Sequence, residues 1–304
     1  MIAPFNAVTA YGIMISEKPV NWKGVMMNKL ITQWHEQGYI SVKNLLNKNE
    51  VKQLLDICNR IKKQFDENNQ SASGETFCMR HLNHPDYYIN HKNEYEIFMN
   101  TICHEKILSI VNQILNQKSM FRTTSYFFEP KSGIKDGNWH RDTQFIYKDE
   151  AREKEEVLKA ASQPAQGIQL QIALEPSDDI EYVPYSHKRW DTTEEYQIRL
   201  KDNQINNRSN AMPNAVRFHQ EPGDMVAFDS NGLHRGRYHS DKIRRTLMLT
   251  YSSKPYFDYF TDQPWFLTDQ NFKNLPLRTQ EYFHPFIETF RPKWEEKIRS
   301  LANS

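Results

Sequence analysis

The stretch Gly167-Ile168-Gln169-Leu170-Gln171-Ile172-Ala173-Leu174 places apolar side chains at every second position. Successive side chains of a β-strand point to opposite faces, so this period of two predicts a strand with one apolar face. The opposite face carries Gln169 and Gln171, which point either to solvent or to a polar pocket. The stretch therefore indicates a sheet and leaves open what covers its glutamine face.

More strands are predicted on both sides of this stretch, at residues 120–128, 139–146, 225–228 and 245–251. They are rich in β-branched and aromatic residues and are bounded by turn signals such as Pro222-Gly223-Asp224. In the last of them, Arg245 shares a face with apolar side chains. Several short strands with helices only at the periphery predict a mainly β protein whose core is a double-stranded β-helix, the jelly-roll or cupin-like fold.

Helical spacing of apolar residues is found mainly outside these strands, at residues 22–36, 50–66 and 104–117. A capping box that begins at Asn47 precedes the second of these segments. The highly charged residues 149–161 fit either a solvated helix or a lid. We expect one domain over 1–304, with a helical part at about 20–117, a jelly-roll core at about 118–254 and an aromatic-rich cover, or an oligomer interface, at about 255–304.

The composition favours a small-molecule partner. The 304 residues include 39 Lys and Arg against 38 Asp and Glu, so no excess of charge indicates nucleic acid or a membrane surface. The three cysteines form no C-x-x-C pair, which argues against a disulfide framework and a structural zinc site. Residues 1–18 resemble neither a signal peptide nor a membrane span, so a cytoplasmic location is expected. The sequence leaves monomer and homodimer open.

Three His-x-Asp steps are candidates for a metal site, at His84, His140 and His239. Two histidines and one carboxylate form the facial triad of non-haem Fe(II) oxygenases. On a strand, His140 and Asp142 would project from the same face. A jelly roll brings distant strands together, so His234, which follows the strand at 225–228, is the predicted third ligand.

An arginine near the end of the chain supports this choice. Arg245 lies eleven positions after His234, on the apolar face of a predicted strand. A buried arginine needs a partner, and a carboxylate satisfies its guanidinium with two parallel hydrogen bonds. The steps at His84 and His239 have no comparable third histidine with a downstream arginine.

The sequence resembles the phytanoyl-CoA dioxygenase family of Fe(II)/2-oxoglutarate-dependent oxygenases. The segments that carry the resemblance are residues 34–40, 139–142, 181–190, 233–236, 244–247 and 258–265. One departure is Tyr185, where the family commonly has glycine in a Pro-Gly-Ser-His turn. A side chain at this position can reshape the pocket wall and weakens analogies about the substrate.

The resemblance implies Fe(II) bound by His140, Asp142 and His234, with 2-oxoglutarate bound by Arg245, O2 as oxidant and ascorbate as a reductant. It implies oxidation of an unactivated C–H bond in a small, carboxylate-bearing metabolite, by hydroxylation, desaturation or oxidative cyclisation. The presence of Asp142 disfavours halogenation. Candidates for the substrate pocket are Arg122, Tyr126, Trp139, Gln171 and Arg237. The alternative is a cupin-like protein that binds a metal or ligand without oxygenase turnover.

Overall fold

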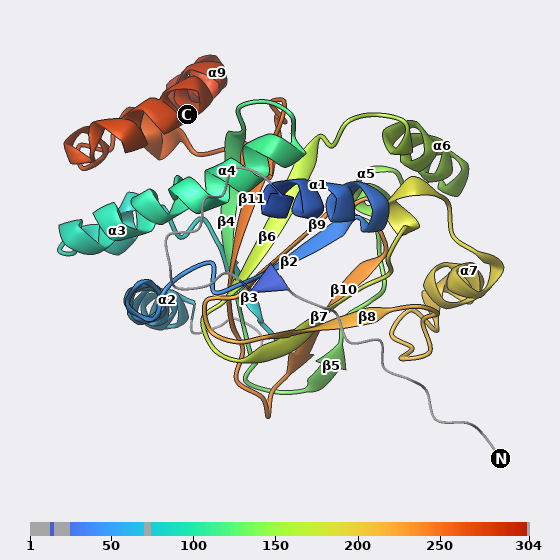
Figure 1. Cartoon of the computed structure of the whole chain (residues 1–304). Coiled ribbons are helices and arrows are strands. Elements are labelled where there is room, and N and C mark those ends of the chain that lie inside the picture. The colour runs from blue at the N-terminus through green and yellow to red at the C-terminus, as the bar shows by residue number, and fades with distance from the viewer. Residues whose placement is uncertain (1–12, 15–24, 70–73, 303–304) are drawn as a thin grey trace.

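The computed structural model describes residues 13–14, 25–69 and 74–302 (Figure 1). Residues 1–12 and 15–24 lie outside the described residues. The prediction that residues 1–18 form neither a signal peptide nor a membrane span falls mostly on them, as does the start of the helix expected at 22–36. Among the described residues, no helix combines the length and apolar character needed to cross a membrane.

Within the described residues, the larger sheet has seven strands. Their order is β1 (Ile13–Met14), β2 (Tyr39–Lys43), β9 (Met225–Phe228), β6 (Gly167–Ala173), β11 (Arg245–Ser252), β4 (Met120–Phe128) and β3 (Cys78–Arg80). All neighbours are antiparallel except β1 and β2. The strands expected at 120–128, 167–174, 225–228 and 245–251 are confirmed.

The smaller sheet contains β5 (Ile134–Asp136), β10 (His234–His239), β7 (Ser177–Tyr182) and β8 (Val216–Gln220), in that order and antiparallel. The strand expected at 139–146 is wrong. His140 forms an isolated bridge with His234, and the chain then turns into the short helix α5 (Thr143–Ile146). The backbone is already helical at Asp142, with φ −63° and ψ −24°, so strand geometry ends before this residue.

The helices α2 (Lys48–Asn68), α3 (Lys92–Ile102), α4 (Glu105–Ile114) and α9 (Leu277–Ala302) lie on one side of the larger sheet, and α1 (Val25–Gln37) lies beside β2 (Figure 1). The side chain of Asn47 accepts hydrogen bonds from the backbone N–H groups of Asn49 and Glu50, which confirms the expected cap. The helices α6 (Glu150–Ala161) and α7 (Thr193–Arg199) lie on the opposite side of the molecule from α2 and α3 (Figure 1), and α8 (Lys201–Gln204) contacts α7.

More of the described residues are helical than lie in strands, which corrects the expectation of a mainly β protein. The fold is a mixed one, with two antiparallel sheets and extensive helical layers. Residues 277–302, within the expected aromatic-rich cover, form a helix whose buried aromatic side chains pack against the main apolar core.

The two faces of the larger sheet have different chemistry. Tyr126, Leu170 and Leu247 belong to the face that packs on the helices in the main apolar core. The opposite face carries Gln169, Gln171 and Thr246 and looks toward the smaller sheet. Gln220 of β8 confirms this contact between the sheets, since its Nε2 donates to the carbonyl of Gln171 at 3.2 Å. The space between the sheets is therefore lined on this side by polar groups.

Candidate active site

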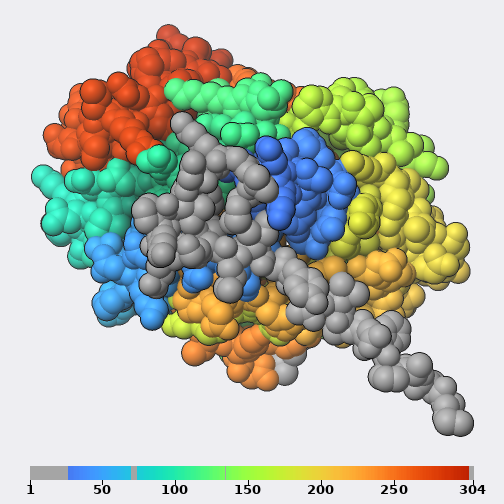
Figure 2. Space-filling model, viewed as in Figure 1, coloured from blue at the N-terminus to red at the C-terminus, as the bar shows by residue number. Residues whose placement is uncertain are grey.

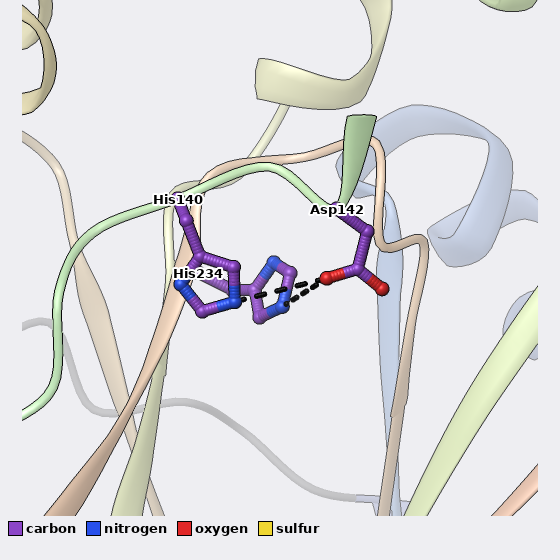
Figure 3. Close-up of side chains that lie close together, drawn as sticks. All are labelled: His140, Asp142 and His234. Carbon is purple, nitrogen blue, oxygen red and sulfur yellow. Dashed lines mark ion pairs between the residues drawn. The ribbon is translucent and has the colours of Figure 1, made fainter. Parts of the chain in front are cut away.

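His140, Asp142 and His234 meet at one end of the space between the two sheets (Figure 3). Asp142 Oδ1 lies 3.7 Å from His140 Nε2 and 3.6 Å from His234 Nε2. The three ligand atoms all lie within 4.8 Å of one another, and no other such group of three occurs in the described part of the chain. A divalent ion of the first transition row binds nitrogen and oxygen at about 2.0–2.2 Å, and these separations leave room for it.

Both imidazoles are oriented by their second nitrogen. His140 Nδ1 lies 2.7 Å from the carbonyl oxygen of Asn138, and His234 Nδ1 lies 3.0 Å from that of Gly232. A carbonyl oxygen can only accept, so Nδ1 carries the proton and the Nε2 lone pair faces the centre of the triad. Histidines that bind metals are oriented in this way, and the donor set therefore fits a metal ion.

The backbone around the histidines is held by strand pairing. The N–H of His140 donates to the carbonyl of His234 at 3.0 Å, and the reciprocal bond has the same length. Burial and the neighbouring His140 lower the pKa of His234 to about 4, which keeps its ring neutral. A neutral ring is the form that binds a metal.

The carboxylate of Asp142 is held from its other side by β6. Gln169 Nε2 donates to Asp142 Oδ2 at 2.6 Å, while Oδ1 faces the two histidines. The glutamine face of β6 was expected to point either to solvent or to a polar pocket, and the contact with Asp142 supports the polar pocket.

A second carboxyl near the triad was missed by sequence reasoning. Asp229, directly after β9, is buried and accepts a hydrogen bond from the backbone N–H of Asn231 at 2.9 Å. Burial raises the pKa of Asp229 to about 6, and the charge of Asp142 adds to this effect. The sequence offers no motif for Asp229. It lies near the triad only because the fold places the end of β9 there.

Arg245 does not face the triad. Its guanidinium forms an ion pair with Glu129, and its Nε donates to Asn59 of α2 at 2.9 Å. It shares the helix-covered face of β11 with Leu247, as the alternation predicted, but this face looks away from the space between the sheets. The position of Arg245 therefore does not support the expectation that it binds the cosubstrate.

Arg244, one residue earlier, lies between the sheets and is 2% exposed. Its Nη1 donates to the carbonyl of Arg237 at 2.8 Å, and its guanidinium carbon lies 4.8 Å from the ring centre of Tyr238 in β10. A Cβ atom added to Gly236, two residues after His234, would lie 3.2 Å from Arg244 Nη1. The guanidinium of Arg244 therefore packs against the inner face of β10, the strand that begins with His234.

The lining around Arg244 contains buried polar atoms without a hydrogen-bond partner among the described residues. They are Arg244 Nε and the side-chain hydroxyls of Ser125 and Thr246. Ser125 and Thr246 belong to β4 and β11, on the face that looks toward the smaller sheet. Buried polar groups are usually satisfied, so this row of orphans indicates a place for a polar ligand.

Of the five residues expected to line the substrate pocket, Gln171 lies in the space between the sheets and Arg122 lies near the triad. Gln171 is buried on the inner face of β6, and its Oε1 lies 3.4 Å from Arg244 Nη2. Arg122 directly precedes Thr123, which pairs with Thr250 of β11, and Thr250 also pairs with Gln169. Arg122 therefore lies at the end of β4 that is nearer to the triad. The guanidinium of Arg122 is paired with Asp258 and lies over the ring of Tyr256.

The other three pocket candidates point elsewhere. Tyr126 donates to Asn59 on the helix-covered face. Trp139 is buried in a separate apolar cluster and donates to the carbonyl of Ser209 at 2.9 Å. Arg237 is paired with Asp136 and Glu181. Strand periodicity alone could not decide this, because both faces of these strands are covered.

The competing His-x-Asp steps are used differently. His84 lies 4.4 Å from the ring of Trp265, centre to centre, and its Nδ1 accepts from the backbone of Asp86. His239 Nε2 lies 2.8 Å from Asp136 Oδ1. The choice of the step at His140 agrees with the single three-ligand group found in the described residues.

Two histidines and one carboxylate that converge on one point are the ligand set typical of non-haem Fe(II) oxygenases. The family model for phytanoyl-CoA dioxygenase matches residues 34–246. The chain belongs to the phytanoyl-CoA dioxygenase family and is by class an Fe(II)/2-oxoglutarate-dependent oxygenase. No curated protein sequence gives a significant match.

Solved structures of similar fold agree with this assignment. AviO1 from Streptomyces viridochromogenes Tue57 is 15% identical with a TM-score of 0.54, covering 76% of this chain and 97% of that chain. HygX from Streptomyces hygroscopicus, a structure with nickel and 2-oxoglutarate bound, is 11% identical with a TM-score of 0.53, covering 76% and 88%. The epimerase SnoN in complex with Fe3+, alpha ketoglutarate and nogalamycin RO is 15% identical with a TM-score of 0.51, covering 78% and 89%. At these identities the likeness concerns the fold.

Proposed function

We propose that the protein oxidises a C–H bond of a small molecule with Fe(II), 2-oxoglutarate and O2, using a metal bound by His140, Asp142 and His234. The observation that carries this proposal is the convergence of the three ligand atoms, with both Nδ1 atoms already engaged by carbonyl oxygens. We infer that the two facing sheets form the double-stranded β-helix of this fold and that residues 1–304 act as one oxygenase domain.

When bound, iron and 2-oxoglutarate would supply the oxidising chemistry that side chains lack. The residues of the chain have other tasks. Asn138 and Gly232 hold the tautomers of the histidines through their carbonyl oxygens, and Gln169 holds one oxygen of Asp142. His140, Asp142 and His234 would hold the metal with three side chains, and a metal with this ligand set can also bind small molecules.

Arg244, in place of Arg245, is the proposed partner of the distal carboxylate of 2-oxoglutarate. Its buried Nε has no partner among the described residues, and the orphan hydroxyls of Ser125 and Thr246 lie on the same inner face. Two residues of β10 separate His234 from Gly236, or about 7 Å. The terminal carbons of 2-oxoglutarate lie roughly 5 Å apart, from four C–C bonds of about 1.5 Å each, so a molecule of this length would fit between the triad and Arg244.

The substrate is proposed to be a small molecule, and hydroxylation is the default outcome. Arg122 and Arg237 give no support to a carboxylate on it, because both guanidiniums are already paired with acidic side chains. Desaturation and oxidative cyclisation use the same metal centre and are decided by where the substrate lies.

The adjacent arginines provide a sharp test. We expect Arg244→Leu to raise the KM for 2-oxoglutarate at least about 30-fold, because losing a buried charged partner costs about 2–5 kcal/mol. Arg245→Leu removes the same group from the helix-covered face and is the matched control, with a KM within a few-fold of wild type. The measurement is succinate formation in the presence of Fe(II) and ascorbate.

Two results would contradict the proposal. If Arg245→Leu raises the KM and Arg244→Leu does not, the cosubstrate lies elsewhere. If the wild-type protein forms no succinate, or if His140→Ala leaves succinate formation unchanged, the alternative of a cupin-like binding protein is favoured.

A further inference from the structure

Four charged side chains form a buried network behind the metal-ligand turn. Arg141 Nη2 lies 2.8 Å from Asp191 Oδ1, and Arg199 Nε lies 2.6 Å from Asp191 Oδ2. Arg199 Nη1 also lies 3.0 Å from Glu153 Oε1. All four side chains are almost completely buried, and the ring of Trp190 lies under Arg199 at 4.9 Å. Cations and anions alternate along the network, so its formal charge is zero.

The network is attached to the residues on both sides of Asp142. Arg141, one of its members, directly precedes this ligand. Thr143 Oγ1 donates to Glu153 Oε1 at 3.0 Å. Gln144 Oε1 accepts from Arg199 Nη1 at 3.1 Å. The turn that presents the carboxylate of Asp142 to the histidines is therefore fixed through three of its side chains, while the carboxylate itself takes no part in the network.

Arg141 extends the network toward the other ligand segment. It donates to the carbonyl oxygens of Ser186, at 2.7 Å, and of Asn231. Asn231 lies in the loop between β9 and His234. The guanidinium of Arg141 thus connects the turn at Asp142 to the loop that leads to His234.

Of the other three members, Asp191 lies in the segment before α7 and the other two come from helices. Glu153 belongs to α6 and Arg199 to α7, and Figure 2 shows these two helices adjacent on the surface of the molecule. Residues 149–161 fitted a solvated helix or a lid from sequence. The helix is formed and is largely exposed, as the first alternative expected, and the buried pairing of Glu153 with Arg199 and Thr143 anchors it to the ligand turn.

Buried ion networks are a costly way to stabilise a fold, because apolar residues of similar volume often serve as well or better. We propose that the network of Arg141, Asp191, Arg199 and Glu153 positions Asp142 for metal binding, so that metal affinity depends on α6 and α7. This inference rests on the proposed metal centre. The four members are positioning residues, since none of them is among the three metal ligands.

The test uses the full-length, metal-free protein and Co(II), titrated anaerobically and followed by the visible absorption of the bound ion. Thr143→Val and Gln144→Leu each remove one bond to the network without removing a buried charge. We expect each to weaken Co(II) binding roughly 10- to 100-fold, the range found when groups that orient metal ligands are lost. Thr143→Ser keeps the hydroxyl and is expected to restore the affinity of wild type.

Glu153→Gln tests the network itself, and Asp224→Asn is its matched control. Asp224 is a buried carboxylate paired with Lys43 at 2.7 Å, but it precedes β9, at the opposite end from the triad. We expect Glu153→Gln to weaken Co(II) binding and Asp224→Asn to leave it unchanged. If Glu153→Gln does not fold, the variants at Thr143 and Gln144 decide.

Wild-type affinity in both Thr143→Val and Gln144→Leu, together with loss of binding in Asp142→Ala, would overturn this inference and leave the metal centre intact. Absence of Co(II) binding by the wild-type protein would instead overturn the metal centre. Equal weakening by Asp224→Asn would show a general effect of stability and would also overturn the positioning role.

Discussion

His187 is a titratable group whose environment differs strongly between the folded and the unfolded chain. It lies in the turn after β7 and is 7% exposed. Burial lowers its pKa to about 4, and the charges of Lys188 and Arg141 act in the same direction. The folded protein therefore keeps this ring neutral at pH values where the unfolded chain, with a pKa of about 6.5, takes up a proton.

The sign of the pH effect follows from this difference. Well above pH 6.5, His187 is neutral in both the folded and the unfolded chain, so it does not make the free energy of unfolding depend on pH. As the pH falls toward about 4, the unfolded state alone gains the proton, so the free energy of unfolding decreases. For His187 the decrease between pH 7 and pH 5 amounts to about 2 kcal/mol.

We therefore expect His187→Gln to flatten the pH dependence of stability. Urea unfolding of the metal-free protein at pH 7 and pH 5 measures it, and the drop in the free energy of unfolding should be smaller in the variant by about 2 kcal/mol. His81, whose pKa is also lowered to about 4, retains its own contribution in both proteins. Parallel pH profiles of variant and wild type would show that His187 does not titrate in this range.

At the scale of elements, the strands could be predicted from sequence but the direction of their faces could not. The alternation in β6 and β11 correctly grouped Arg245 with Leu247 and Gln169 with Gln171. Both faces of the larger sheet are covered, one by helices and one by the smaller sheet. Arg245 was expected to bind the cosubstrate from the apolar face, and that face packs on the helices instead. The alternation therefore led to Arg245 and not to its neighbour Arg244, which we propose as the cosubstrate's partner.

The ligand turn shows a second limit of periodicity. His140 and Asp142 were expected to share a face of one strand, but the chain leaves strand geometry at Asp142 and enters α5. The three ligand atoms converge nonetheless, and Arg141 between the two ligands points into the buried network, which we propose to hold the turn. No local pattern predicts this, since Asp191 and Arg199 lie some 50 or more residues further along the chain.

The helix α9 provides the prediction at this scale. Trp294 is fully buried, stacks 5.8 Å from Phe290, and donates from Nε1 to the carbonyl of Thr261 at 3.1 Å. We expect Trp294→Ala to lower the free energy of unfolding by about 3–5 kcal/mol, because it leaves a large cavity. Ile298→Ala, one turn later on the same face but 40% exposed, should cost about 0.5 kcal/mol or less. Denaturant unfolding of both variants measures the difference, and equal small effects would contradict the packing of α9 on the core.

For the whole molecule, the metal and the cosubstrate should act as crosslinks between the two sheets. The triad joins the turn at Asp142 to β10, and Arg244 lies at the start of β11 in the larger sheet. A ligand that binds only the folded state stabilises it by about 2.7 kcal/mol at 100 times its dissociation constant. A chain of this size should then melt roughly 4 °C higher.

Thermal unfolding can separate the two crosslinks. We expect Mn(II) to raise the Tm of the metal-free protein, EDTA to reverse the shift, and 2-oxoglutarate to add a second increment only when the metal is present. Asp142→Ala should lose both increments because it removes a ligand of the ion. Arg244→Leu should keep the first and lose the second, since its guanidinium holds only the distal carboxylate. An equal response of Arg244→Leu and wild type to 2-oxoglutarate would place the cosubstrate outside the space between the sheets. A metal shift that survives in Asp142→Ala would place the ion outside the triad.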